Sequence, residues 1–236
     1  MKKSLLMAAM VLISAGCMAQ KANVNKAKNL MGAETPDFAG ARVAIADALE
    51  NEETKGQANT WYVAGLIGYK QNEKALLDQM MGQAVDESII GPAVLESYKY
   101  WLKADELASQ QMIDKKGNPM VDKKGNPVID TKTRSQIAKK IMEYYEKQDL
   151  VKYGIYLNDQ RDFATAYEVF KAHLDIPELS MMDEKMKAKM PKDTTYMQYK
   201  YYEAIFAIQA EMHPEAIAVL EEMKNGEDEA VSVNQF

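Results

Sequence analysis

The stretch from Leu150 to Pro177 constrains the fold of this chain more than any other. Two groups of apolar and small residues in it follow the spacing of one helix face, separated by a polar turn at residues 158–161. The first group is Leu150, Tyr153, Gly154 and Leu157, and the second is Phe163, Ala166, Tyr167, Phe170 and Leu174. Pro177 cannot continue a helix. The sequence therefore predicts two short amphipathic helices that pack against each other.

Gly154 and Ala166 lie twelve residues apart, one in each predicted helix. Small residues at these places let two antiparallel helices approach closely. The arrangement resembles a tetratricopeptide (TPR) hairpin, and the chain as a whole is similar to exported TPR-repeat proteins of Gram-negative bacteria. This resemblance implies an all-α fold in which hairpins stack into a solenoid around one continuous core.

The same pattern recurs three more times in looser form. Its small anchor residues are Ala41, Ser97, Ala166 and Ala216, which lie 56, 69 and 50 residues apart, whereas regular TPR units repeat about every 34 residues. Trp61, followed four residues later by Gly65, matches a TPR first helix, with the indole expected beside the glycine. A connecting segment around residues 73–92 is expected to displace the second helix of that hairpin. We therefore expect an irregular TPR-like helical-hairpin array over residues 20–226.

An eight-residue unit is duplicated between Ile113 and Val128: the sequence IDKKGNPM is followed by VDKKGNPV. The Gly-Asn pairs mark turns, and the two prolines exclude a helix. We expect a short β-hairpin-like or loop insertion at about residues 112–132. From Met112 to Arg134 the chain carries a local net charge of +3, with Lys115, Lys116, Lys123, Lys124, Lys132 and Arg134 against Asp114, Asp122 and Asp130. Docking of a partner and simple tolerance of a surface insertion are both open.

Residues 1–19 have the pattern of a secretory signal peptide. Lys2 and Lys3 precede an apolar run that is too short to span a bilayer, and small residues follow. Cleavage after Ala19 predicts an exported, periplasmic chain. A rival cut precedes Cys17, because residues 14–17 resemble a lipoprotein box; lipidation of Cys17 would attach the chain to the outer membrane.

Composition argues against several classes of function. Without Lys2 and Lys3 the chain has 27 basic and 35 acidic residues, a net charge of about −8, so nucleic-acid binding is not expected. Cys17 is the only cysteine and the chain has 2 histidines, which leaves no thiolate nucleophile or zinc pattern. We expect no catalytic residues, no cofactor and no metal, and hence a non-enzymatic protein.

The TPR resemblance implies binding of protein partners through a concave surface lined by the first helix of each hairpin. The residues that it places there are Asn59, Tyr62, Tyr69, Lys152, Asn158, Tyr201 and Tyr202. Tyrosine serves both helix packing and interfaces, so both roles stay open for the tyrosines. The predicted function is a cell-envelope interaction scaffold; the alternative is a glycan-binding surface lipoprotein built on TPR helices.

The last segment is expected to start another helix. Asn225-Gly226 reads as the end of the fourth hairpin, and residues 227–236 as the beginning of a further helix. Ten residues are too few for a stable isolated helix. The sequence therefore favours an array that is truncated here, with docking on another protein or on a second copy as the alternative.

Overall fold

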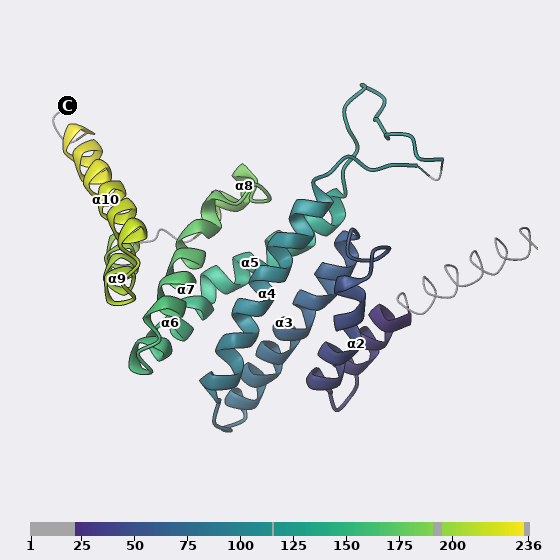
Figure 1. Ribbon diagram of the computed structural model, residues 1–236, viewed down its shortest axis with the longest axis horizontal. Helices are drawn as coiled ribbons and strands as arrows, with labels where there is room; N and C mark the ends of the chain where they lie inside the picture. Colours follow the sequence, from purple (N-terminus) through teal and green to yellow (C-terminus); the bar gives the residue numbers. More distant parts are fainter. Residues whose placement is uncertain (1–21, 115, 191–194, 234–236) are drawn as a thin grey trace, which may run out of the picture. The chain divides into compact units, whose positions relative to one another are not determined.

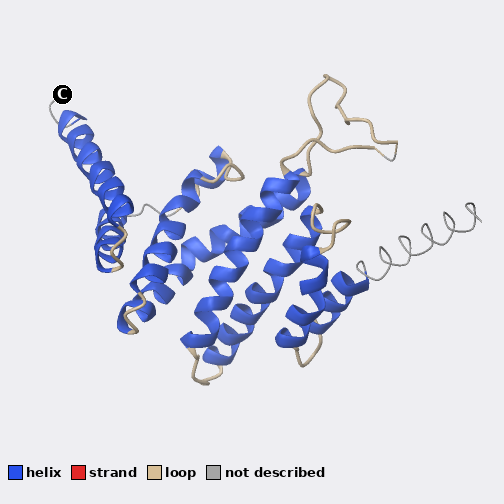
Figure 2. Ribbon diagram, in the orientation of Figure 1, coloured by secondary structure: helices blue, strands red, loops and turns tan. Residues whose placement is uncertain are grey.

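The computed structural model describes residues 22–114, 116–190 and 195–233, with side chains as far as Asn225. This part of the chain is mostly helical and contains no β-strand, as Figure 2 shows. The all-α prediction is thus confirmed. The predicted signal peptide and Cys17 lie outside the described residues.

The chain forms two compact units, Met1–Ile137 and Ala138–Phe236. Unit 1 contains a helix over residues 22–31 and then α2 (Phe38–Glu50), α3 (Ala58–Met80) and α4 (Glu87–Ala108). Helix α5 (Thr131–Lys147) crosses the boundary between the units. Unit 2 continues with α6 (Asp149–Asp159), α7 (Phe163–Asp175), the 3-10 helix η1 (Ile176–Glu178), α8 (Glu184–Lys187), α9 (Tyr196–Gln209) and α10 (His213–Val233). Figure 1 labels the α-helices from α2 onward.

Aspartates fix the start of several of these helices. Asp37 accepts a hydrogen bond from the Gly40 N–H at 2.7 Å, and Asp86 accepts one from the Ser88 N–H at 3.0 Å. Each carboxylate satisfies a first-turn amide that has no partner within the helix.

The connection between α3 and α4 is shorter than the sequence predicted. Residues 73–80 continue α3, and α4 starts at Glu87, so most of the expected connecting segment is helical and only residues 81–86 connect the two helices. Pro92 lies inside α4. Although a proline removes one backbone donor, its position in the second turn leaves most of the long helix uninterrupted.

Gly65 admits the neighbouring helix, as predicted, but the indole beside it is that of Trp101. A Cβ at Gly65 would overlap the Trp101 ring, which is fully buried and whose Nε1–H donates to the Tyr62 carbonyl at 3.2 Å. Trp61 is half-buried and donates from Nε1 to the Lys55 carbonyl at 2.6 Å. The sequence assigned the indole to the wrong tryptophan, because Trp101 comes from the other helix.

In unit 2 the α6–α7 pair follows the prediction. A Cβ at Gly154 would lie 2.5 Å from the Phe170 ring and 3.0 Å from Val169, so the glycine is the place where α6 touches α7. All four anchors, Ala41, Ser97, Ala166 and Ala216, are buried.

The pairs α6–α7 and α9–α10 share one turn, offset by fifty residues. Arg161 and Glu211 both have positive φ, 61° and 59°. In each turn the amide that follows the positive-φ residue donates back to a carbonyl near the end of the first helix. Asp162 N donates to Leu157 O, and Met212 N donates to Ala207 O. This is the helix-ending pattern in which a left-handed residue lets late amides return to free carbonyls.

The end of the chain differs from the prediction. Helix α10 continues through Asn225 and Gly226 to Val233, so no hairpin closes there and residues 227–233 belong to the same helix. An isolated glycine costs a helix only about 1 kcal/mol relative to alanine. The Asn-Gly pair was therefore too weak a signal to end a helix.

Candidate interaction surface

The seven residues that the sequence placed on a concave surface divide between the two units. Asn59, Tyr62 and Tyr69 belong to α3 in unit 1, and the other four belong to α6 and α9 in unit 2. Each unit therefore has to be considered as its own candidate surface.

In unit 1, Tyr69 is a core residue. It is 4% exposed and its ring centroid lies 5.5 Å from that of Trp101, so the packing role holds and the surface role is wrong. Tyr62 is half-buried against the core formed by α2 and α3, and this burial raises the pKa of its phenol. Asn59 is exposed and lines a pocket of about 240 Å³ with Asn25.

In α6, Lys152 and Asn158 are both exposed. The Lys152 Nζ lies 3.2 Å from Oδ1 of Asp149, a buried carboxylate in the first turn of the helix. This acid also interacts favourably with the positive end of the helix dipole. Lys152 thus has a local structural role. Asn158 lies near the end of α6, and its side chain makes no hydrogen bond with the described residues.

In α9, Tyr201 and Tyr202 are 52% and 36% exposed. Their ring centroids lie 6.2 Å apart, and the Tyr202 ring also meets the Phe170 ring edge-on at 6.0 Å. Gln198 Nε2 donates to the Tyr202 hydroxyl at 3.0 Å. Tyr202 is therefore held in place by the core below it, whereas Tyr201 projects further into solvent.

Two further residues of α9 belong to this surface and were missed in the sequence. Met197 is 42% exposed and Ile208 is 44% exposed. With Tyr201 they follow the spacing i, i+4 and i+11, which places them on one side of the helix. The buried Ala204 lies on the same side of α9, three residues after Tyr201 and four before Ile208, so helical spacing alone does not separate the exposed residues from the buried one. We call Met197, Tyr201, Tyr202 and Ile208 the α9 surface.

A charged network underlies α9. Lys200 Nζ lies 3.0 Å from Glu203 Oε2 and 2.7 Å from Glu222 Oε2 on α10. Burial alone lowers the pKa of the Lys200 amine, but its hydrogen bonds and attraction to the two glutamates raise it on balance. Burial raises the pKa of Glu203, with Lys200 acting against that shift. The network joins α9 to α10.

The duplicated arm forms two equivalent loops. Asp114 Oδ1 accepts from the Asn118 N–H at 2.9 Å, and Asp122 Oδ1 accepts from the Asn126 N–H at 2.9 Å. These bonds, followed by those from the asparagine side chains, lower the pKa of both carboxyls. Isolated bridges pair Ile113 with Pro119 and Val121 with Pro127, so the arm is hairpin-like as expected, without forming a strand.

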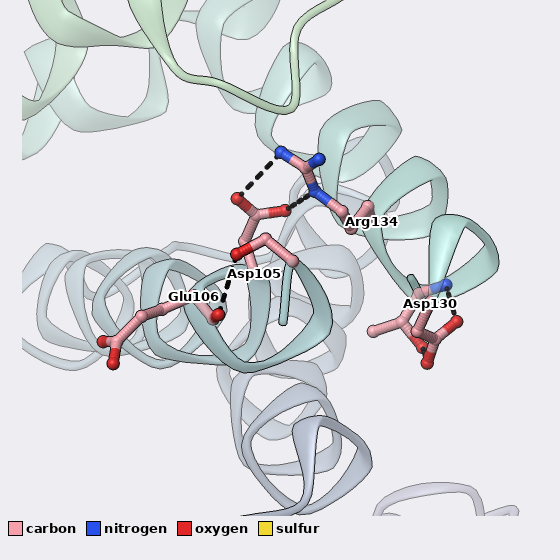
Figure 3. A network of polar contacts seen from close by, with 6 residues as sticks. Asp105, Glu106, Asp130 and Arg134 are labelled. Atoms are coloured by element: carbon pink, nitrogen blue, oxygen red, sulfur yellow. Dashed lines mark hydrogen bonds and ion pairs between the residues drawn. The ribbon is translucent and has the colours of Figure 1, made fainter. Parts of the chain in front are cut away.

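The base of the arm makes polar contacts with α4 and α5. Two of the charged residues counted with the arm therefore have structural roles. Arg134 Nε lies 2.7 Å from Oδ1 of Asp105, a buried carboxylate of α4 (Figure 3). Asp130 accepts from the Thr133 N–H at 3.0 Å and so caps α5. Arg134 and Asp130 are structural residues, and Lys115 lies outside the described residues. Lys116, Lys123 and Lys124 are the exposed cations of the arm itself.

His173 of α7 is buried among aromatic rings. It is 1% exposed, stacks on Tyr145 at 4.7 Å between ring centroids and meets Tyr199 edge-on at 5.6 Å. In the described part of the chain, His, Cys, Asp and Glu side chains form no group of three or more that could hold a metal ion. No described helix is long and apolar enough to cross a membrane.

No family model matches this chain, and no curated protein or solved structure is significantly similar to it.

Proposed function

We propose that this chain is a non-enzymatic interaction scaffold of the cell envelope, an irregular TPR-like protein that binds partner proteins through the first helices of its hairpins. The observation that carries the proposal is the α9 surface. Four apolar or aromatic side chains on this one helix are between 36% and 52% exposed. Tyrosine and methionine are residue types that are enriched where proteins bind each other.

The chemistry of the α9 surface suits a protein partner. Tyr202 is fixed by Phe170 and Gln198, so little side-chain freedom would be lost when a partner covers it. Tyr201 offers a ring and a hydroxyl at its edge. Rigid aromatic anchors of this kind supply much of the binding energy in protein interfaces.

The experiment is site-specific photo-crosslinking in the cells that make the protein. A photoreactive phenylalanine analogue in place of Tyr201 is expected to give a discrete protein adduct. The same analogue in place of Val43, which is 76% exposed on α2, is the matched control and is expected to give none. The added substitutions Met197→Ser and Ile208→Ser are expected to remove the Tyr201 adduct.

The result also separates the alternative function. Exposed tyrosine rings stack on sugars as well as on proteins, so a glycan-binding lipoprotein would give no protein adduct at Tyr201 and would bind oligosaccharides in a Tyr201-dependent way. It would also need Cys17 to be lipidated, which palmitate labelling of wild type and Cys17→Ser measures. Protein adducts formed in equal yield at Tyr201 and Val43 would contradict the scaffold function, because they would not be specific to the α9 surface.

A further inference from the structure

A second candidate site lies in unit 1, where the loop that joins α2 to α3 (Figure 2) meets the helix over residues 22–31. A pocket of about 240 Å³ opens there, and none of its six lining side chains carries a charge. The lining residues are Val24, Asn25, Thr54, Gln57, Asn59 and Thr60. The volume is below the roughly 300 to 1,000 Å³ of pockets that take drug-sized ligands, so the pocket suits a small polar group.

The first turn of α3 reaches this pocket without a capping carboxylate. Helices α2, α4, α7 and α8 each follow an aspartate whose side chain accepts a hydrogen bond from a first-turn amide. Gln57 precedes α3 and makes no such bond, and its Nε2 donates to the Glu53 carbonyl at 2.6 Å. Among the described residues, no group accepts a hydrogen bond from the N–H of Ala58 or Asn59. These two donors stand at the positive end of the helix dipole and are open to a ligand.

Thr60, the third residue of α3, lies at the floor of the pocket with an unpaired hydroxyl. The residue is 1% exposed, and its Oγ1 has no hydrogen-bond partner in the described part of the chain. Thr54 beside it is also 1% exposed, but its Oγ1 donates to the Ala48 carbonyl at 2.6 Å. A buried hydroxyl without a partner is unfavourable, and a ligand that pairs with it removes that cost.

The chemistry of these groups selects the charge of the ligand. The first-turn N–H groups are fixed by the backbone and can only donate, and the Thr60 hydroxyl can donate beside them. Asn25 and Asn59 are exposed at the rim, and their side-chain amides can turn either end toward a ligand. A cation would meet the positive end of the helix dipole and no carboxylate in the lining, whereas an anion at a helix N-terminus is favoured.

We propose that this pocket binds a small oxyanion, the carboxylate or phosphate group of a small molecule. One oxygen accepts hydrogen bonds from the Ala58 and Asn59 N–H groups, in the place that an aspartate carboxylate takes before other helices. A second oxygen accepts from the Thr60 hydroxyl, and the Asn25 amide reaches the ligand from the rim. The site belongs to unit 1, so the proposal does not depend on the α9 surface, which belongs to unit 2.

Amide NMR of the full mature chain tests the proposal. Inorganic phosphate and acetate are the two oxyanion probes, glucose is the neutral probe, and chloride keeps the ionic strength constant. At least one oxyanion is expected to shift the Ala58 and Asn59 N–H signals and the Asn25 side-chain amide saturably, in the millimolar range because no lysine or arginine lines the pocket. Glucose and chloride are expected to cause no saturable shift. Saturation by phosphate alone identifies a phosphate ligand, and saturation by acetate alone a carboxylate.

Two variants of the site locate the binding. Gln57→Asp places a carboxylate of the chain itself where aspartates stand before α2 and α4, so it is expected to raise the urea midpoint and to abolish the saturable shifts. Thr60→Val keeps the shape of the side chain and removes the hydroxyl. It is expected to weaken the oxyanion by about tenfold or more, with no loss of stability because the hydroxyl has no partner among the described residues.

Asn29→Asp is the matched control for the charge added by Gln57→Asp. Asn29 is exposed on the helix over residues 22–31 and does not line the pocket. Its replacement is expected to leave the affinity within about twofold of wild type, because an exposed charge away from the site is screened by salt.

Four results would overturn the proposal. The first is no saturable shift with either oxyanion, which would mean that water alone fills the pocket. The second is equal saturation by glucose. The third is binding by Gln57→Asp as strong as that of wild type, and the fourth is equal loss of binding in Asn29→Asp. None of these measurements involves α9, so their failure is distinct from a failure of the photo-crosslinking experiment.

Discussion

Replacing Gly68 by alanine tests how closely α3 and α4 pack. A methyl group at this position would overlap the carbonyl oxygen of Ala93, lie 3.0 Å from its carbonyl carbon and reach 2.5 Å from Ser97 Oγ. The first two atoms belong to the α4 backbone and cannot turn away as a side chain can. The two helices would have to separate in order to accept one methyl group.

Two effects of opposite sign set the expected magnitude. Alanine is favoured over glycine inside a helix by about 1 kcal/mol. Overpacking a well-filled contact costs about 1 to 3 kcal/mol, and the cost lies at the upper end when backbone must move. Separation of the helices would also loosen Trp101, which is fully buried beside Gly65. The free energy of unfolding is therefore expected to fall by roughly 1 to 2 kcal/mol.

Urea unfolding followed by tryptophan fluorescence measures this change in unit 1 alone. The chain has 2 tryptophans, and Trp61 and Trp101 both lie in unit 1. Gly56→Ala is the matched control, because nothing lies within 4 Å of a Cβ there; its stability is expected to stay the same or rise slightly. A Gly68→Ala variant as stable as wild type or more stable would refute the close approach of α3 and α4.

Three further outcomes follow from unit 2 and the arm. Ala166→Leu, at a position with no exposed surface, is expected to lower the stability of unit 2 by about 1 to 3 kcal/mol; far-UV circular dichroism during urea unfolding measures it, and unchanged stability would place Ala166 at the surface. Deleting residues 113–128 with a short Gly-Ser closure is expected to leave helicity and the unfolding midpoint nearly unchanged, because loop closure depends weakly on length; a cooperative loss of helix would show that the arm packs on the core. The pKa values of Asp114 and Asp122 are lowered in the folded arm. The ordered loop conformation is therefore expected to be fully present above the ordinary carboxyl pKa of 3.8 and to be lost as the pH falls through the lower folded values. Amide NMR shifts of the arm measure this loss, and shifts that begin to change well above this range would contradict the hydrogen bonds to the carboxylates.

The sequence predicted best where one short stretch determines the structure. In α6 and α7 the apolar spacing, Gly154, the polar turn and Pro177 all agree, and the observed helices follow them. The arm was equally local, because the duplicated Gly-Asn turns and prolines exclude a helix over most of its length. Agreement between local signals is what makes such a segment predictable.

Expectations that needed distant partners were less secure. Trp61 stood in the right pattern, but the indole that fills the space beside Gly65 comes from Trp101, and spacing within one helix does not reveal which ring from another helix arrives there. Tyr69 was assigned to a surface for the same reason. The exposed row on α9 was missed because it shares a side of the helix with the buried Ala204, and spacing within one helix does not show which of its residues a neighbouring helix covers.

Three residues at eight-residue intervals hold the arm together. Met112 N donates to Val128 O, Met120 N donates to Met112 O, and Val128 N donates to Met120 O, so the repeats close into a ring of backbone bonds. Asp130 stands at the next position of the aspartate series and donates its N–H to the Ala108 carbonyl at the end of α4. Loss of one repeat would leave the two remaining ring members able to pair as Met120 and Met112 do. We therefore expect that an arm with one repeat fewer would still join the end of α4 to the start of α5 at the same residues.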